Sequence, residues 1–329
     1  MPATNIPQVV LQYGVESAAG TLVAATRVVD VTPGSVNWKR DMNPIYVRNA
    51  GSYATAHRAY AGQETTEVDW SASATFNRLV DYGNLFFNAV AVGTGSGTTR
   101  TWTFTPSDTT DGLKRYSFEY GGTNMPSAYT LNGAVGKSFA VSIKPNTPWD
   151  IKATVLGMAT TAGSITGSLS LPSSLNGDDV LWTQTKVYVD TSSTFGTTQH
   201  VGDIVSADFQ LTNGVDARHT LDAAATPFRV ALDKERSVEV TVVAEYDLQT
   251  EYTAWAAATQ QRVQLKATGP NSRSAILNIN GIWDTVPIGQ DQGVVTLQMK
   301  LKGLYESAVN SSDVQMVLVN GVTTTTSIP

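Results

Sequence analysis

Residues 133–138, GAVGKS, end in the Gly-Lys-Ser that closes a phosphate-binding loop. Such a loop wraps phosphates with backbone amides and needs an earlier glycine, a strand before it and a helix after it. Leu131 holds the place of that earlier glycine, and the residues that follow, FAVSI, predict a strand. The segment is therefore not expected to bind a nucleotide.

The chain contains three histidines, His57, His200 and His219, and no cysteine. The histidines are isolated from one another, whereas zinc sites are built from clustered His and Cys, so no metal site is expected. The Gly-x-Ser-x-Gly elbow of a serine hydrolase is missing, and the 28 acidic residues show no signature of a glycosidase pair. We therefore expect no catalytic residue, no cofactor and no enzymatic activity.

The composition suits a protein with about two domains of roughly 150 residues each. The chain has 329 residues, of which 41% are hydrophobic and 15% charged. It has no apolar run of the roughly 18 residues that a membrane helix needs, and MPATNIPQVV lacks the build of a signal peptide. The expectation is a soluble protein, made in a cytoplasm, that does not interact with membranes.

The net charge of −6 is uneven, because residues 201–329 carry 14 acids against 9 basic residues. No basic stripe runs along the chain. Tight binding of DNA or RNA depends on Lys and Arg that neutralise phosphates, so a nucleic-acid clamp is not expected. DNA that passes the protein without sticking to it is compatible with this charge.

Strand patterns dominate the sequence. Short runs with alternating apolar and polar residues, such as KSFAVSIK (137–144) and VVTLQMKLKG (294–303), predict half-buried strands. Asn-Gly and Asp-Gly pairs favour tight hairpins and predict turns between antiparallel strands. These pairs lie at 111–112, 132–133, 176–177, 213–214, 280–281 and 320–321.

Two segments predict helices, at about 76–90 and 248–259, the second with Asp247 as N-cap. Each follows a strand, and the two strands match when Glu67 is aligned with Glu239, an offset of 172 residues. The match predicts an internal duplication. The expected fold is mainly β, with two tandem β-sandwich or half-barrel domains, each flanked by one short α-helix. The predicted boundaries are 1–170 for the first domain, 171–200 for a linker and connecting strand, and 201–329 for the second domain.

Residues 32–62 form a long segment with little periodicity, which predicts a loop that a partner orders. Aromatic residues and arginines dominate the centres of protein interfaces. The segment is therefore a candidate protein-binding arm, and an ordinary surface excursion is the alternative. The candidate arm residues are Trp38, Arg40, Tyr46, Arg48, Tyr53 and Arg58.

The order of these features resembles the tail tube proteins of long-tailed bacteriophages, over roughly 28–158 and 201–320. The likeness rests on the long first segment and on a strand that runs directly into one helix. It also rests on later paired strands. The segments are TEVDWSASATFNRLVDYGNLFF (66–87), KSFAVSIKPNTPWDIKATVLGM (137–158), GDIVSADFQLTNGVDARHTLD (202–222), ERSVEVTVVAEYDLQTEYTAW (235–255) and GVVTLQMKLKGLYE (293–306).

The resemblance implies a structural subunit whose sheets join those of its neighbours into rings, and rings that stack into a tube with a β-barrel lumen for DNA. Two domains in one chain imply three chains per pseudo-hexameric ring. The implied partners are further copies of the chain and the tape-measure, tail terminator and baseplate proteins. The implied location is the virion, after assembly in the host cytoplasm. The candidate arm then becomes a contact to the next ring.

Four acids, Glu67, Asp69, Glu239 and Glu245, are candidates for lining the lumen, because a surface that repels phosphate lets DNA slide. Outer solvent is the alternative location for them. Two other roles stay open at this point. One is a distal tail or baseplate ring protein with the same fold, and the other is a two-domain carbohydrate-binding adhesin.

Overall fold

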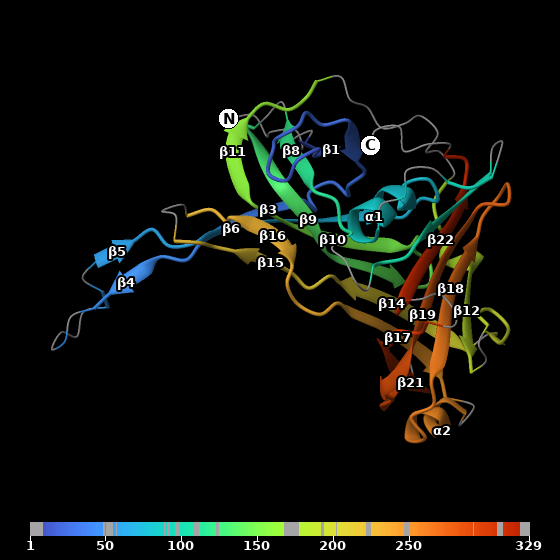
Figure 1. Cartoon of the computed structure of the whole chain (residues 1–329). Helices are drawn as coiled ribbons and strands as arrows, with labels where there is room; N and C mark the ends of the chain where they lie inside the picture. Colours follow the sequence, from blue (N-terminus) through green and yellow to red (C-terminus); the bar gives the residue numbers. More distant parts are fainter. Residues whose placement is uncertain are drawn as a thin grey trace.

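The computed structural model describes residues 9–322 except 49, 51–54, 57, 89, 91, 92, 96–98, 108–111, 123, 124, 168–177, 192, 193, 202, 222–224, 247–249, 292 and 308–311. The fold is mainly β with large antiparallel sheets, as predicted (Figure 1). The elements of residues 9–163 are β1 (Val9–Val15), β2 (Arg27–Val29), β3 (Asn37–Met42), β4 (Ile45–Val47), β5 (Arg58–Tyr60), β6 (Glu64–Ser73), α1 (Leu79–Phe86), β7 (Arg100–Phe104), β8 (Tyr116–Gly122), β9 (Ala128–Ile143), β10 (Asp150–Gly157) and β11 (Ala159–Gly163). Those of residues 182–320 are a 3-10 turn (Trp182–Gln184), β12 (Thr185–Asp190), β13 (Gln199–His200), β14 (Ile204–Thr212), β15 (Val215–Arg218), β16 (Arg229–Leu232), β17 (Ser237–Glu245), α2 (Thr250–Ala256), β18 (Gln261–Thr268), β19 (Ser274–Thr285), β20 (Ile288–Asp291), β21 (Val294–Gly303) and β22 (Val314–Asn320).

A central sheet runs through both halves of the chain in the order β3, β6, β10, β9, β14, β17, β21, and ends with the C-terminal part of β19 and β20. Burial alternates along β6 and β17, because successive side chains of a strand point to opposite faces. The apolar face of this sheet contributes to one continuous core that includes residues of both halves.

Each half adds an outer sheet that covers the apolar face. The first half uses β2, β1, β8, β9 and β11, and the second half uses β13, β12, β18, β19 and β22. The long strands β9 and β19 take part in both kinds of sheet. From the first half, β7 pairs with β22 and so extends the outer sheet of the second half.

The strand pairings of the first half have counterparts in the second half. In both, the strand before the helix lies between an earlier strand and a later strand, as β6 lies between β3 and β10, and β17 between β14 and β21. A β-bulge also recurs. It lies between Thr154 and Val155 in the pairing of β10 with β9, and between Lys300 and Leu301 in the pairing of β21 with β19. This correspondence fits two repeats, although the predicted boundaries remain a proposal, and β12, from the predicted connecting segment, pairs with β18.

Both predicted helices are present but shorter than predicted. α1 is buried along its whole length and lies in the interior between the sheets (Figure 1), so it packs on all sides and not by one stripe. α2 has no fully buried residue, and Tyr252 and Trp255 rest half-buried against the core. Asp247, the predicted N-cap, lies outside the described residues.

The prediction of tight turns at the Asn-Gly pairs is wrong for 132–133 and 280–281, which lie inside β9 and β19. Both pairs lie where a long strand passes from one sheet to the other. A Cβ on Gly281 would stand 2.0 Å from the carbonyl oxygen of Lys302, so glycine permits a close approach of two backbones there. Asn213 and Gly214 connect β14 to β15, and the Asn213 side chain donates to the carbonyl oxygen of Phe86 at 2.8 Å.

Candidate assembly surfaces

The two halves of the chain are joined edge to edge within the central sheet. β9 of the first half pairs with β14 of the second half, from Ala207 opposite Ile143 to Thr212 opposite Ser138. This junction leaves one edge strand at each end of the sheet. Among the described residues β3 pairs with β6 alone, and β20 pairs with β21 alone. Backbone donors and acceptors on such edges are available to pair with another chain.

The free edge at β20 corresponds to the edge of β9 that is occupied inside the chain. Ile151 of β10 pairs with Val141, and the matching residue Leu297 of β21 pairs with Ile288, so Ile288 corresponds to Val141. Val141 is 1% exposed beside β14, whereas Ile288 is 56% exposed. The difference marks a surface that a neighbouring strand covers in one half and not in the other.

The opposite free edge is β3, the counterpart of β14. Asn37 of β3 lies opposite Asp69 of β6, as Asp208 of β14 lies opposite Thr241 of β17. Trp38 is half-buried, stacks on Tyr120 with ring centroids 5.8 Å apart, and donates from Nε1 to the Thr160 hydroxyl at 3.1 Å. Trp38 therefore fastens the strand to the outer sheet, and the outer edge of the strand is unpaired in the described structure.

The four candidate lumen acids lie on the polar face of the central sheet, because the strand registers place them on the side opposite the core. Glu67 forms an ion pair with Lys137, and Glu239 Oε2 lies 2.9 Å from Lys300 Nζ. Asp69 accepts a long hydrogen bond of 3.4 Å from the side-chain amide of Asn37. Glu245 is exposed at the end of β17.

The same polar face also carries lysines, which the sequence interpretation missed. Lys39 lies opposite Glu67, Lys152 opposite Ser71, and Lys302 opposite Glu239. The alternation of Lys300 and Lys302 along β21 was the available signal. The face is therefore mixed in charge, and two of the four candidate acids, Glu67 and Glu239, form ion pairs with lysines.

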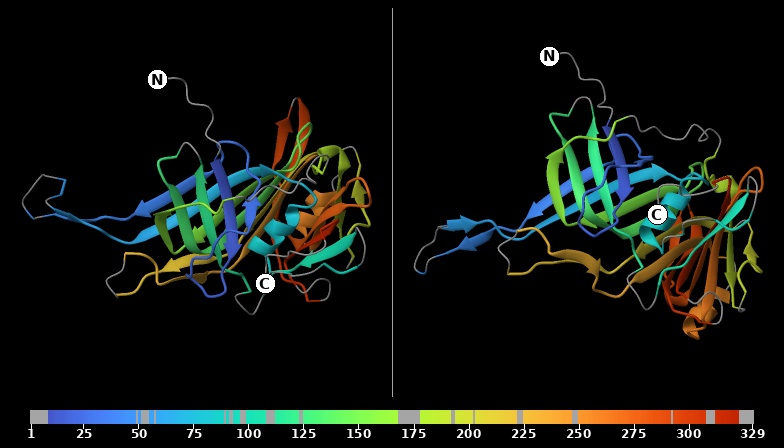
Figure 2. Two further views of the ribbon diagram at one scale, coloured as in Figure 1. Left: turned by 90° about the horizontal axis from the view of Figure 1, so that it is seen from above. Right: turned by 45° about the horizontal axis from the view of Figure 1, so that its top comes forward.

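The candidate arm, 32–62, is not a structureless loop. Its first part is β3, so Trp38 and Arg40 belong to the central sheet, and Arg40 binds the Glu64 carboxylate in a two-pronged contact at 2.6 and 2.8 Å. The rest is the hairpin of β4 and β5, which extends away from the body of the protein in every view (Figure 1, Figure 2). Tyr46, Arg48 and Arg58 lie exposed on this hairpin, and Tyr53 lies outside the described residues.

A second hairpin, formed by β15 and β16, occupies the corresponding place between β14 and β17. It does not extend outward. Val215 and Val230 pack against Val135 and Leu156 of β9 and β10 in a small separate core. The sequence interpretation did not identify this contact, since four-residue strands leave little periodicity to read.

The chemical alternatives find no support in the described geometry. GAVGKS lies inside β9, as a strand and not as a phosphate loop. His200 contacts two carboxylates, with Nδ1 2.8 Å from Asp203 and Nε2 3.3 Å from Glu251, and the hydrogen bond to Glu251 raises the pKa of His200 to about 9. His219 contacts the carbonyl oxygen of Glu64 at 3.1 Å, and His57 lies outside the described residues. The described residues contain no group of three or more His, Asp or Glu placed to hold a metal.

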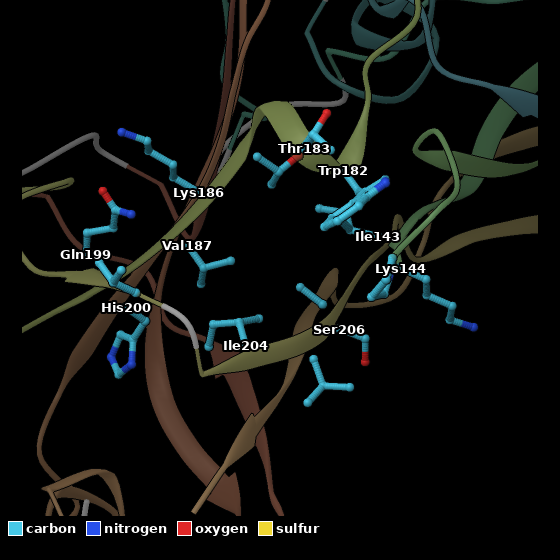
Figure 3. Close-up of a pocket in the computed structure, with 15 residues that line it drawn as sticks. Ile143, Lys144, Trp182, Thr183, Lys186, Val187, Gln199, His200, Ile204 and Ser206 are labelled. Carbon is cyan, nitrogen blue, oxygen red and sulfur yellow. The ribbon is translucent and has the colours of Figure 1, made fainter. Parts of the chain in front are cut away.

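A cavity of about 260 Å³ opens where β9, β12, β13 and β14 meet (Figure 3). Ile143, Val187 and Ile204 give it apolar walls, and no carboxylate is among its lining residues. The amino groups of Lys144 and Lys186 point away from its centre. It therefore lacks the convergent polar groups of a catalytic site.

The unpaired sheet edges and the exposed hairpin are therefore the candidate contact surfaces among the described residues. In the described part of the chain, no helix is long and apolar enough to span a membrane. A search of curated proteins finds no match. The family model of the phage tail tube protein matches residues 7–312, which is most of the chain and includes every strand of the central sheet. The chain belongs to the phage tail tube protein family.

Proposed function

We propose that this chain is a non-enzymatic structural subunit that assembles into closed rings of three chains, which stack into the tail tube. The observation that carries the proposal is the junction of β9 with β14, which leaves the corresponding edges, β20 and β3, without a partner among the described residues at opposite ends of one sheet. A second copy that presents β3 to β20 repeats the internal junction. Two repeats in each of three chains give a ring with pseudo-sixfold symmetry.

Ring closure also removes a liability. An open sheet with two unpaired edges invites uncontrolled association, and closure into a barrel leaves no edge unpaired. Rotation that closes on itself limits lateral growth, while stacking along the axis permits a tube to lengthen. The tape-measure, tail terminator and baseplate proteins are the proposed partners that set where the tube starts and ends, in a virion assembled in the host cytoplasm.

The part of the polar face that the hairpin of β15 and β16 leaves uncovered is the proposed lumen lining, because this hairpin packs on the same face at Leu156, opposite Glu67. Glu67 and Glu239 lie on the polar face in ion pairs with Lys137 and Lys300, so these two cations are not free to bind phosphate. A Lys or Arg that binds DNA releases counterions and holds the strand, which would slow transit. A mixed face with paired charges conducts DNA without specific binding.

Electron microscopy of the purified protein tests this function. Stacked hollow rings are the expected result. Isolated rings that never stack support a distal tail or baseplate ring protein instead. A monodisperse monomer that binds glycans would overturn the proposal in favour of a carbohydrate-binding adhesin.

A further inference from the structure

We propose that the hairpin of β4 and β5 docks on the central sheet of the adjacent copy in the same ring, against Ile282, Leu304 and Tyr305. This inference rests on the proposed ring. The hairpin then contacts the adjacent copy in its own ring and not a copy in the next ring. The docking of a second hairpin of the same chain serves as a template.

The template is the hairpin of β15 and β16. It leaves the central sheet between β14 and β17 and lies across β9 and β10, with Val215 and Val230 against Val135 and Leu156. Its connecting loop reaches β6, where the amide of Glu64 donates to the carbonyl oxygen of Ala225 at 2.8 Å. The hairpin thus crosses the sheet of the first half from one side to the other.

The hairpin of β4 and β5 has the same construction. It leaves the sheet between β3 and β6, the counterparts of β14 and β17, and each hairpin has ten residues between its strands, 48–57 and 219–228. Ile45 pairs with Tyr60 at its base, as Val215 pairs with Leu232. Ile45 and Tyr60 are 58% and 52% exposed, whereas Val215 is 6% exposed. The first hairpin therefore carries the apolar residues without a surface that covers them.

A matching surface is exposed at the other end of the central sheet. Met158 packs beside the docked hairpin, and its backbone amide donates to the carbonyl oxygen of Asn132 at 2.9 Å. In the second half, the backbone amide of Leu304 donates to the carbonyl oxygen of Asn280 at 2.8 Å. Leu304 therefore corresponds to Met158. Val135 pairs with Leu156 of β10 just past the bulge, and Ile282 pairs with Lys302 of β21 just past the matching bulge, so Ile282 corresponds to Val135. Leu304 and Tyr305 are 45% and 48% exposed, so the second half carries uncovered apolar residues here. Lys302, which forms an ion pair with Asp284, stands at the place of Leu156, so this surface is apolar at Leu304 and charged at Lys302.

Charge favours the same pairing. Residues 43–62 contain Arg48 and Arg58 and no Asp or Glu, while residues 201–329 carry 14 acids against 9 basic residues. A basic hairpin and an acidic acceptor half attract one another, and this attraction steers encounter between copies. A second copy is thus the occupant that the repeated strand register, the exposed apolar residues and the opposite net charges favour.

The absence of cysteine makes a cross-linking test direct. The variant I45C/L304C is treated, in the assembled state, with a short bifunctional thiol reagent, and the products are separated under denaturing conditions. The matched control is Y46C/L304C, because Tyr46 is equally exposed but points to the opposite side of β4. Micrographs of the same samples report whether rings have formed.

The expected result is a set of covalent products from I45C/L304C that ends at the number of chains in one ring, with little product from the control. Products that extend beyond one ring would place the hairpin on a stacked ring and overturn the docking. Rings without cross-links, or equal linkage of both variants, would also overturn it. If no rings form at any concentration, the proposed function fails, and the docking fails with it.

Discussion

Replacement of Ile288 by alanine is expected to weaken ring assembly without lowering the stability of the single chain. Ile288 is 56% exposed in the isolated chain, and its counterpart Val141 is 1% exposed. The substitution removes three carbons, each worth about 0.8 kcal/mol when fully buried. Only the exposed 56% of the side chain remains to be covered by a neighbour, so the loss of binding free energy is about 1.3 kcal/mol per interface. This corresponds to a roughly tenfold higher dissociation constant.

The effect is measured by mass photometry across a concentration series, together with urea unfolding of the monomer. A ring of three chains has three such interfaces, so the losses add to about 4 kcal/mol for the closed ring. Val201→Ala is the matched control, because Val201 is 78% exposed and lies between β13 and β14, not on the β20 edge strand. An I288A chain that assembles like the wild type, or one whose monomer is destabilised by more than about 1 kcal/mol, would refute the assignment of β20 as an assembly edge.

Two further predictions concern the single chain. Arg273→Ala is expected to destabilise it by about 3 kcal/mol in urea unfolding, because the fully buried carboxylate of Asp178 loses its ion-pair partner. Arg218→Ala, which removes a mostly exposed side chain from its pair with Asp233, is the control and should destabilise the chain far less. The pKa of His200 is raised to about 9 by its hydrogen bond to Glu251, so its stabilisation is complete below about pH 6.5, the ordinary histidine pKa, and is lost as the pH rises through 9. H200Q should therefore unfold with less dependence on pH between 6.5 and 9.5, and an unchanged pH profile would contradict this role.

Periodicity in the sequence was sufficient to predict the strands that bury one face and the helices that follow them. The alternation of β6 and β17 is visible in residues 64–73 and 237–245, and the helices begin within a few residues of their predicted positions. The local pattern is informative there because the residues that face the core recur at a regular spacing along each element. The resemblance to tail tube proteins added the family, which the family model confirms.

Features that depend on partners distant in sequence were not predictable in this way. β3 alternates weakly, since among the described residues it pairs with β6 alone, while Trp38 packs on the outer sheet, and its exposed edge carries no apolar signal. α1 is buried on all sides because two halves of the chain enclose it, and a single stripe cannot reveal that. Asn132 and Asn280 lie inside strands because long strands bend between sheets at these positions, although the same dipeptides ordinarily favour turns.

For the candidate acids, the strand register adds information that the sequence spacing alone does not contain. Spacing by two along β6 placed Glu67 and Asp69 on one face, but only the pairing of strands shows that Lys137 and Lys300 contact the acids of this face. A lumen lined by paired charges is thus a different proposal from a purely acidic one. It predicts little change in DNA transit when single acids are neutralised together with their lysine partners.

The number of chains in one ring tests the central claim most directly. Native mass spectrometry of rings, with electron microscopy of the same sample, measures it. Our account predicts a hollow ring with six similar lobes and the mass of three chains of 35.1 kDa each. A ring of six chains, or a protein that stays monomeric at high concentration, would contradict the pairing of β3 with β20.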